Sequence, residues 1–318
     1  VDEFEKIGIK CFGPTAKAAQ LEGSKTFAKS FMQKYRIPTA TYQSFTDPHL
    51  AKEFLKNSTY PMVIKANGLA AGKGVCIVNN FTMAEKSVDE IMTDHKFGNA
   101  GATIVVEEFL EGEEVSFIAM VDGVNILPLA TSQDHKAIKD GDTGPYTGGM
   151  GAYSPVPFVD ADLQRKIMDQ IMLPTVHGMI NEGIPYRGFL YAGLMISDQN
   201  EPKVLEFNCR FGDPETQPIM MRLSSDLVEL IQACFDETIE SFPIKWDKRT
   251  ALGVIMASLG YPEKYETNME INGLDGTDLA DPDLKIFHSG TTIINDQIVT
   301  NGGRVLCVTA LGRDVKQA

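Results

Sequence analysis

Hydrophobic and polar positions repeat along this chain with two different periods, one typical of helices and one of strands. Phe27, Phe31 and Tyr35 recur at helical spacing behind Ser24, which can cap a helix, and this helix should end before Pro38. The same spacing predicts further helices near residues 163–171 and 227–234. The chain therefore contains helices that each bury one apolar face.

Short apolar runs bounded by turn residues predict the strands. They lie at 62–66, 75–78, 103–109 and 115–121, with a tight hairpin at Asp122-Gly123 and a second hairpin that pairs 188–196 with 204–211. We expect a lone strand at 7–15, an irregular binding loop at 133–157, and a β-rich unit from about Pro243. The mixture predicts an α/β chain without internal repeats.

Composition narrows the class of protein. At 318 residues, 43% hydrophobic and 23% charged, the chain can form two or more structural units. The sequence has no apolar run of about 18 residues and no signal-peptide core at its start, so we expect a soluble, cytoplasmic protein. Its five scattered cysteines are interpreted as reduced thiols. A net charge of -14 argues against nucleic acid, so a phosphorylated ligand would need locally concentrated donors.

The segment 63–75, VIKANGLAAGKGV, sets two lysines around a glycine-rich turn, which suits polyphosphate binding. It is not a P-loop, because Gly68 and Gly72 flank only three residues and Gly74 follows Lys73 in place of a hydroxyl residue. The turn therefore belongs to another phosphate-binding design.

The segment 205–215, LEFNCRFGDPE, places polar side chains on a strand. Because a strand alternates its faces, Glu206, Asn208 and Arg210 should project to one side. A carboxylate and an amide oxygen suit Mg²⁺, and the arginine would lie where a charged oxygen develops. The pattern leaves open the alternative of a solvated sheet face with one surface ion pair.

Three lysines are candidates for contacts with phosphate. Lys25 lies in the first helical turn, where the dipole disfavours a cation by roughly 0.3 to 1 kcal/mol, so it either serves a phosphate or reaches into water. Lys65, within the strand MVIKA, needs a buried anion or a route to solvent, unless it snorkels from an edge strand. Lys73 is interpreted as a solvated loop residue, or one that closes over phosphate only transiently.

Seven motifs in one order resemble the ATP-grasp superfamily and, within it, the phosphoribosylamine-glycine ligase family. The resemblance runs from about Phe12 to the last residue. Besides the two segments quoted above, the motifs are EGSK (22–25), VEEFLEGEE (106–114), SQDHK (132–136), DTGPYTGGMGAYSP (142–155) and TNGGRVLCVTALG (300–312). Each motif alone is weak, but their shared order makes chance negligible.

The resemblance implies the fold and its domains. The fold class would be α/β (α+β), an ATP-grasp fold of two α+β lobes with a β-rich C-terminal domain, the family's N-terminal domain being absent. We expect a remnant of that domain at 1–24, the ATP-grasp domain at 25–240 with a smaller mobile lobe at about 38–113, and a truncated C-terminal domain at 241–318.

The resemblance also implies the ATP site. Lys25 and Lys65 would contact the phosphates, beneath a glycine lid. The hinge would bind adenine through backbone groups of Glu108 and Leu110, and Glu114 would accept from the ribose hydroxyls. The expected nucleotide-binding residues are Lys25, Lys65, Gly68, Gly72, Lys73, Gly74, Glu107, Glu108, Leu110 and Glu114.

For the metal and the chemistry, the resemblance implies that Glu206 and Asn208 hold Mg²⁺ or Mn²⁺, while Arg210 and Lys65 act in catalysis. ATP would phosphorylate the carboxylate of glycine, and the amine of 5-phosphoribosylamine would then displace phosphate. The expected substrate-binding residues are Asp134, His135, Lys136, Thr147, Gly148, Gly149, Met150, Asp213 and Glu215. We expect small-molecule substrates, no nucleic acid or membrane partner, and a monomer.

The chain departs from the family at two positions of the substrate loop, where Ala137 and Tyr146 replace the usual arginine and asparagine. A third acidic metal ligand has no counterpart near 192–194, so the metal would rely on phosphates and water. Two alternatives stay open: an ATP-grasp ligase for another acid and amine, and a fragment that binds nucleotide but catalyses nothing.

Overall fold

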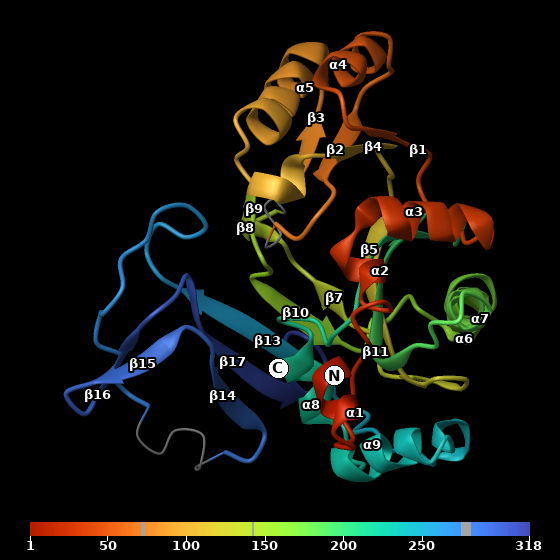
Figure 1. The fold of residues 1–318 in the computed structure, drawn as a ribbon. Helices are drawn as coiled ribbons and strands as arrows, with labels where there is room; N and C mark the ends of the chain where they lie inside the picture. The colour runs from red at the N-terminus through yellow and green to blue at the C-terminus, as the bar shows by residue number, and fades with distance from the viewer. Residues whose placement is uncertain (71–73, 142, 275–280) are drawn as a thin grey trace. The chain divides into compact units, whose positions relative to one another are not determined.

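The structure is a computed structural model that describes residues 1–70, 74–141, 143–274 and 281–318. The chain forms two compact units, each assembled from three stretches (Figure 1). The first unit comprises Val1–Pro128, Val159–Arg210 and Leu230–Phe242, and the second comprises Leu129–Phe158, Phe211–Glu229 and Pro243–Ala318. The three domains predicted from the sequence stay a prediction.

The first unit contains a four-stranded sheet in the order β1-β4-β2-β3. Its strands are β1 (Tyr42–Phe45), β2 (Met62–Ala66), β3 (Val75–Val78) and β4 (Ile104–Glu108). Helices α4 (Pro48–Lys56) and α5 (Phe81–Val88) cover one face of this sheet (Figure 1). Their apolar side chains form one buried cluster with Ile64 and Val106. The strands predicted at 62–66 and 75–78 are confirmed, and alternation turns Lys65 and Glu107 to the face opposite this cluster.

A second sheet of this unit has the order β12-β11-β5-β6. Its strands are β5 (Glu113–Asp122), β6 (Ile126–Pro128), β11 (Arg187–Ile196) and β12 (Pro202–Asn208), and both predicted hairpins are confirmed. Helix α3 (Lys25–Lys34) begins after Ser24, whose hydroxyl accepts from the Phe27 N–H as predicted. Other helices of this unit are α2 (Gln20–Gly23), η1 (Asp89–Thr93), η2 (Gly98–Gly101), α6 (Ala161–Ile167), η3 (Met168–Met172), α7 (Leu173–Asn181) and η4 (Ile239–Ser241).

The strand predicted at residues 7–15 is wrong. Helix α1 (Asp2–Lys6) leads into a segment that joins no sheet. Its aromatic residue Phe12 packs edge-on against Phe189 and Phe235, with ring centroids 5.2 and 6.4 Å away. Phe12 therefore anchors this segment by itself, whereas Ile7 and Ile9 are exposed and form no strand face.

The second unit is built on a five-stranded sheet in the order β14-β17-β13-β10-β7. Its strands are β7 (Gln133–Asp134), β10 (Gly151–Ser154), β13 (Thr250–Ala257), β14 (Leu284–His288) and β17 (Arg304–Gly312). Two separate hairpins are formed by β8 (Ala137–Lys139) with β9 (Thr143–Tyr146) and by β15 (Thr291–Ile294) with β16 (Gln297–Thr300). Helix α8 (Thr216–Arg222) packs on β10, β13 and β17. Helix α9 (Leu227–Phe235) starts in this unit, and its residues from Leu230 onward belong to the first unit. The segment 133–157 is thus not irregular, because its short strands pair with each other and with this sheet.

Candidate functional site

Lys65 is buried in the first unit, with only 6% of its surface exposed. Its Nζ lies 3.0 Å from Glu107 Oε2 and donates to the Leu205 carbonyl at 3.0 Å. Because β2 lies between β4 and β3, the alternative of a snorkelling edge-strand lysine is wrong. Of the two predicted possibilities, a buried anion or a route to solvent, the structure shows the first, and Glu107 is the anion.

Glu107 is 2% exposed and reaches Lys65 from the neighbouring strand as a diagonal cross-strand pair. The same Oε2 atom lies 3.1 Å from Nζ of Lys29, a buried lysine of α3 that our sequence analysis missed. The other oxygen, Oε1, has no hydrogen-bond partner among the described residues. A buried acceptor of this kind fits a ligand that brings its own N–H donor.

Glu206 and Asn208 lie on one face of β12, paired with Gly193 and Tyr191 of β11. The ladder between the two strands shifts register next to Gly193, and Leu205 is the extra residue of this bulge. The Leu205 carbonyl, which accepts from Lys65, immediately precedes Glu206. The bulge therefore joins the buried lysine to the strand that carries the two expected metal ligands.

Arg210 lies beyond the strand, because β12 ends at Asn208. Its predicted place on one strand face with Glu206 and Asn208 is therefore wrong, although its Nη2 still donates to Asn208 Oδ1 at 3.2 Å. Its Nε lies 3.3 Å from Glu22 Oε1, and Glu22 Oε2 accepts from the Cys209 N–H at 2.7 Å. Glu22 thus orients the turn that presents Arg210.

Lys25 occupies the first turn of α3, next to the start of the glycine segment. The Asn67 side chain accepts from the Thr26 N–H at 2.8 Å, and Lys25 Nζ donates to the Gly68 carbonyl at 3.4 Å. Burial lowers the pKa of Lys25, and the nearby Glu206 carboxylate opposes this shift. Of the expected lid residues, Gly68 and Gly74 are described, whereas Gly72 and Lys73 lie outside the described residues.

The expected adenine hinge follows β4. The Glu108 N–H donates to the Thr41 carbonyl at 3.0 Å, so the backbone group that Glu108 could offer a ligand is its carbonyl. Its Oε1 atom accepts from the Thr41 N–H and from Lys203 Nζ, both at 3.1 Å. Leu110 is half-buried after the strand, and Glu114 lies near the start of β5.

In the second unit, the structure brings the segment 134–136 together with the segment 147–150. The Met150 N–H donates to the His135 carbonyl at 2.8 Å, and the Thr147 hydroxyl donates to the Lys136 carbonyl at 2.8 Å. Gly149 has a φ of +108°, and a side chain there would overlap Pro214 and Asp134. Glycine is therefore required at the point where these segments meet.

Arg304, at the start of β17, is a second residue that our sequence analysis missed. Its Nη1 donates to the carbonyls of Gly148 at 2.7 Å and Asp213 at 3.0 Å, and its Nη2 lies 2.8 Å from Asp213 Oδ2. The arginine of the quoted GGR motif was the available signal. Arg304 thus ties two expected substrate segments to β17. Glu215 is 2% exposed, and its carboxylate packs closely against Gly212.

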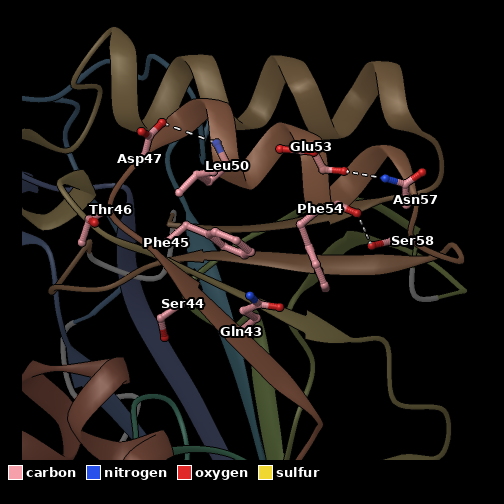
Figure 2. A pocket seen from close by; sticks show the side chains of 10 residues that line it. All are labelled: Gln43, Ser44, Phe45, Thr46, Asp47, Leu50, Glu53, Phe54, Asn57 and Ser58. Carbon is pink, nitrogen blue, oxygen red and sulfur yellow. Dashed lines mark hydrogen bonds between the residues drawn. The ribbon is translucent and has the colours of Figure 1, made fainter.

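A hollow on the first unit is lined by residues of β1, α4 and their connections (Figure 2). Its charged side chains are carboxylates, and Asp47 is engaged in accepting from the N–H groups of His49 and Leu50 at the start of α4. None of the predicted site residues that the structure describes lines it. This hollow is therefore unsuited to phosphate.

Two further features, a metal-binding group of acidic, His or Cys side chains and a membrane-spanning helix, are absent among the described residues. Among the described residues, no three or more His, Cys, Asp or Glu side chains form a metal-binding group. In the same part of the chain, no helix is both long and apolar enough to span a bilayer.

Comparison with known proteins identifies the family. Residues 23–216 match the phosphoribosylglycinamide synthetase ATP-grasp (A) domain, and residues 251–318 match the C domain of that enzyme. The phosphoribosylamine-glycine ligase of Pseudomonas syringae pv. tomato is 55% identical over 318 residues, which are 100% of this chain and 73% of that relative.

Solved structures agree with this match. The crystal structure of the phosphoribosylamine-glycine ligase of Thermotoga maritima is 36% identical with a TM-score of 0.87, over 96% of this chain and 75% of that one. The biotin carboxylase domain of the Hydrogenobacter thermophilus 2-oxoglutarate carboxylase, 15% identical with a TM-score of 0.75 over 98% and 67%, shares the fold alone. The expected ATP-grasp fold is thus confirmed, and the chain belongs to the phosphoribosylglycinamide synthetase family.

Proposed function

We propose that this chain is an ATP-dependent carboxylate-amine ligase that joins glycine to 5-phosphoribosylamine. The products would be glycinamide ribonucleotide, ADP and phosphate. The names of its relatives support this activity, and the chain spans about three quarters of their length. Within the chain, one observation carries the proposal: the buried Lys65 ammonium donates a hydrogen bond to the carbonyl of Leu205, the residue before Glu206.

Lys65 and Lys25 would bind the ATP phosphates. Lys65 engages two described acceptors, and an ammonium has three N–H donors, so one donor is available to a phosphate oxygen. Lys25 adds a second ammonium at the N-terminus of α3, where the helix dipole also favours an anion. A chain with a net charge of -14 would in this way concentrate positive charge where the triphosphate binds.

Glu206 and Asn208 would hold Mg²⁺ or Mn²⁺. Their carboxylate and amide oxygens fit a hard cation, and two protein ligands suit Mg²⁺, which keeps several waters and shares its octahedron with phosphates. The solved structure of the biotin carboxylase domain named above contains the magnesium salt of ADP, which is consistent with this assignment. When bound, the ion would neutralise charge that develops on the transferring phosphoryl group.

The acidic hinge would bind the nucleoside. Glu107 Oε1 is a buried acceptor without a partner among the described residues, and it fits the exocyclic amine of adenine. The Glu108 carbonyl and the backbone of Leu110 would complete the contact with the adenine edge, and Glu114 would accept from the ribose hydroxyls. Carboxylates suit these amine and hydroxyl donors, whereas they would repel a phosphate.

The reaction needs no nucleophilic side chain. An oxygen of the glycine carboxylate attacks the γ-phosphorus, the bond to the β-phosphate oxygen breaks, and ADP leaves. The amine then attacks the acyl carbon of glycyl phosphate, the C–O bond breaks, phosphate leaves and the amine loses a proton. Lys65 and Arg210 would stabilise charge on the phosphoryl group, and the segments around 134–136, 147–150, Asp213 and Glu215 would position the acceptor substrates.

The test is ADP release by the chain with glycine and 5-phosphoribosylamine, compared among wild type, Lys65→Ala and Glu206→Ala. We expect both substitutions to abolish turnover while the far-ultraviolet circular dichroism stays unchanged. Full activity in either folded variant would refute the site. Turnover only with another amino acid would favour a ligase of different substrate specificity, an alternative that the departures at Ala137 and Tyr146 in the substrate loop motivate. ATP binding without any product would favour a fragment that binds nucleotide but catalyses nothing.

A further inference from the structure

Lys29 is a buried lysine that the proposed reaction leaves without a role. It lies one turn after Lys25 on α3 and is 2% exposed. Its Nζ contacts three acceptors: Glu107 Oε2 at 3.1 Å, the Thr39 hydroxyl at 2.8 Å and the Ala40 carbonyl at 3.5 Å. Three acceptors match the three N–H donors of an ammonium, so the site is built for a charged lysine.

Lys29 and Lys65 share one carboxylate oxygen. Glu107 Oε2 lies 3.1 Å from the first ammonium and 3.0 Å from the second, so two buried cations compete for one buried anion. Thr39, the partner of Lys29, donates to the Val204 carbonyl at 2.6 Å, and Lys65 donates to the next carbonyl, that of Leu205. The pair is thereby fixed against the strand that carries Glu206.

This sharing matters for a lysine that must also bind phosphate. If Lys65 were the only partner of Glu107, turning its ammonium toward a phosphate would leave a buried carboxylate uncompensated, which is strongly unfavourable. Lys29 keeps Glu107 compensated whichever way Lys65 turns, and it repels the Lys65 ammonium across the shared oxygen.

We infer that Lys29 is a positioning residue, which holds Glu107 so that the Lys65 ammonium is free to engage the ATP phosphates. The inference rests on the proposed binding of ATP by Lys65. It differs from a merely structural tether between α3 and β4, which would stabilise the fold without affecting phosphate binding in particular.

A dependence on pH follows from the same contacts. Burial lowers the pKa of Lys29 to about 8, against the opposing effect of Glu107. The groups that face it are Glu107 and Glu108 of β4, Lys65 of β2 and the ring of Tyr42 of β1, 5.7 Å away. Above pH 8 a neutral Lys29 no longer compensates Glu107, so Lys65 is held more tightly there and ATP affinity should fall.

The experiment is calorimetric titration of the full chain with ATP in the presence of Mg²⁺ and, separately, with adenosine, which lacks phosphates. For Lys29→Met we expect ATP affinity to fall on the order of tenfold, as for one weakened charge-assisted contact. Adenosine affinity should fall clearly less, because adenosine makes no contact with Lys65 and reaches Glu107 only through Oε1. Lys29→Arg should retain most of the ATP affinity. The matched control is Lys34→Met, which removes an exposed lysine from the same helix and should change neither affinity.

Equal losses of ATP and adenosine affinity in Lys29→Met, or no loss, would overturn the inference. If that variant does not fold, the comparison of wild type with Lys29→Arg decides. ATP affinity should fall more steeply above pH 8 in the wild type than in the variant, because the loss of the Lys25 proton is common to both proteins and that of Lys29 is not. Parallel pH profiles would count against a role for Lys29. Failure of the wild type to bind ATP would instead refute the proposed function, so the two failures are distinguishable.

Discussion

Replacing Glu107 with glutamine should destabilise the first unit more than any comparable surface change. The substitution keeps the shape of the side chain but removes the charge that compensates Lys29 and Lys65 at 3.1 and 3.0 Å. At an effective dielectric constant of 20, each attraction amounts to about 5 kcal/mol before desolvation and the repulsion between the lysines are subtracted. Removing one partner of a buried pair typically costs about 3 to 5 kcal/mol, and we expect that loss here at pH 7.

The loss should shrink as the pH rises. Without Glu107, the pKa of Lys29 falls further below its wild-type value of about 8, so the folded variant releases a proton that its unfolded chain retains. A folded state that binds fewer protons than the unfolded state gains stability with pH, by up to about 1.4 kcal/mol per pH unit and group. Between pH 7 and 8 the wild type keeps more of the Lys29 proton than the variant does, so the variant gains more stability and the difference between the two proteins narrows.

Urea unfolding of wild type and Glu107→Gln at pH 7 and pH 8, followed by circular dichroism, measures both effects. Glu182→Gln is the matched control, because Glu182 pairs with Lys34 and Tyr35 at the surface, where solvent screens the charges, and its loss should cost much less. A loss below about 1 kcal/mol for Glu107→Gln at pH 7, or a loss that stays constant at pH 8, would refute the reasoning.

Three further predictions concern other parts of the chain. Arg304→Gln frees the Gly148 and Asp213 carbonyls, so the KM for glycine should rise on the order of tenfold while the KM for ATP stays level. Steady-state kinetics, with Arg313→Gln as the control, measure both constants, and equal changes in the two would contradict the prediction. Burial raises the pKa of Cys209 to about 11, so it carries little thiolate at pH 8 and iodoacetamide should label it slowly until urea unfolds the chain. Mass spectrometry of the peptide that contains Cys209 measures the labelling, and fast labelling of Cys209 in the folded chain would disprove the burial argument. Asp47→Ala removes the cap of α4 and should cost about 1 kcal/mol in urea unfolding, whereas Asp47→Asn, which still accepts hydrogen bonds, should cost clearly less.

Sequence patterns predicted the local elements around the site. The short apolar run MVIKA predicted β2, and the hydroxyl of Ser24 predicted the start of α3. The cost of burying an ammonium predicted an anion for Lys65, but no local rule could say that Glu107 supplies it, because that contact depends on how β4 pairs with β2.

Other features escaped sequence reasoning for the same physical reason. Lys29 has the spacing of a helix-surface lysine, and only the packing of α3 in the first unit buries it. Strict alternation along LEFNCRFGDPE placed Arg210 on the strand, whereas β12 ends two residues earlier. Apolar character at residues 7–15 predicted a strand, although a strand also needs a neighbour with free backbone groups, and the sequence does not name one.

The bulge at Leu205 shows how a strand can contain one extra residue while its functional side chains stay on the same face. Val204 and Phe207 both face the buried side, and Glu206 and Asn208 share the other side, which is the arrangement that a regular strand one residue shorter would also have. Deleting Leu205 would therefore leave every face in place and remove mainly the carbonyl that Lys65 uses. The sheet does not require the extra residue. We therefore expect evolution to retain it only in relatives in which the lysine at the position of Lys65 is still functional.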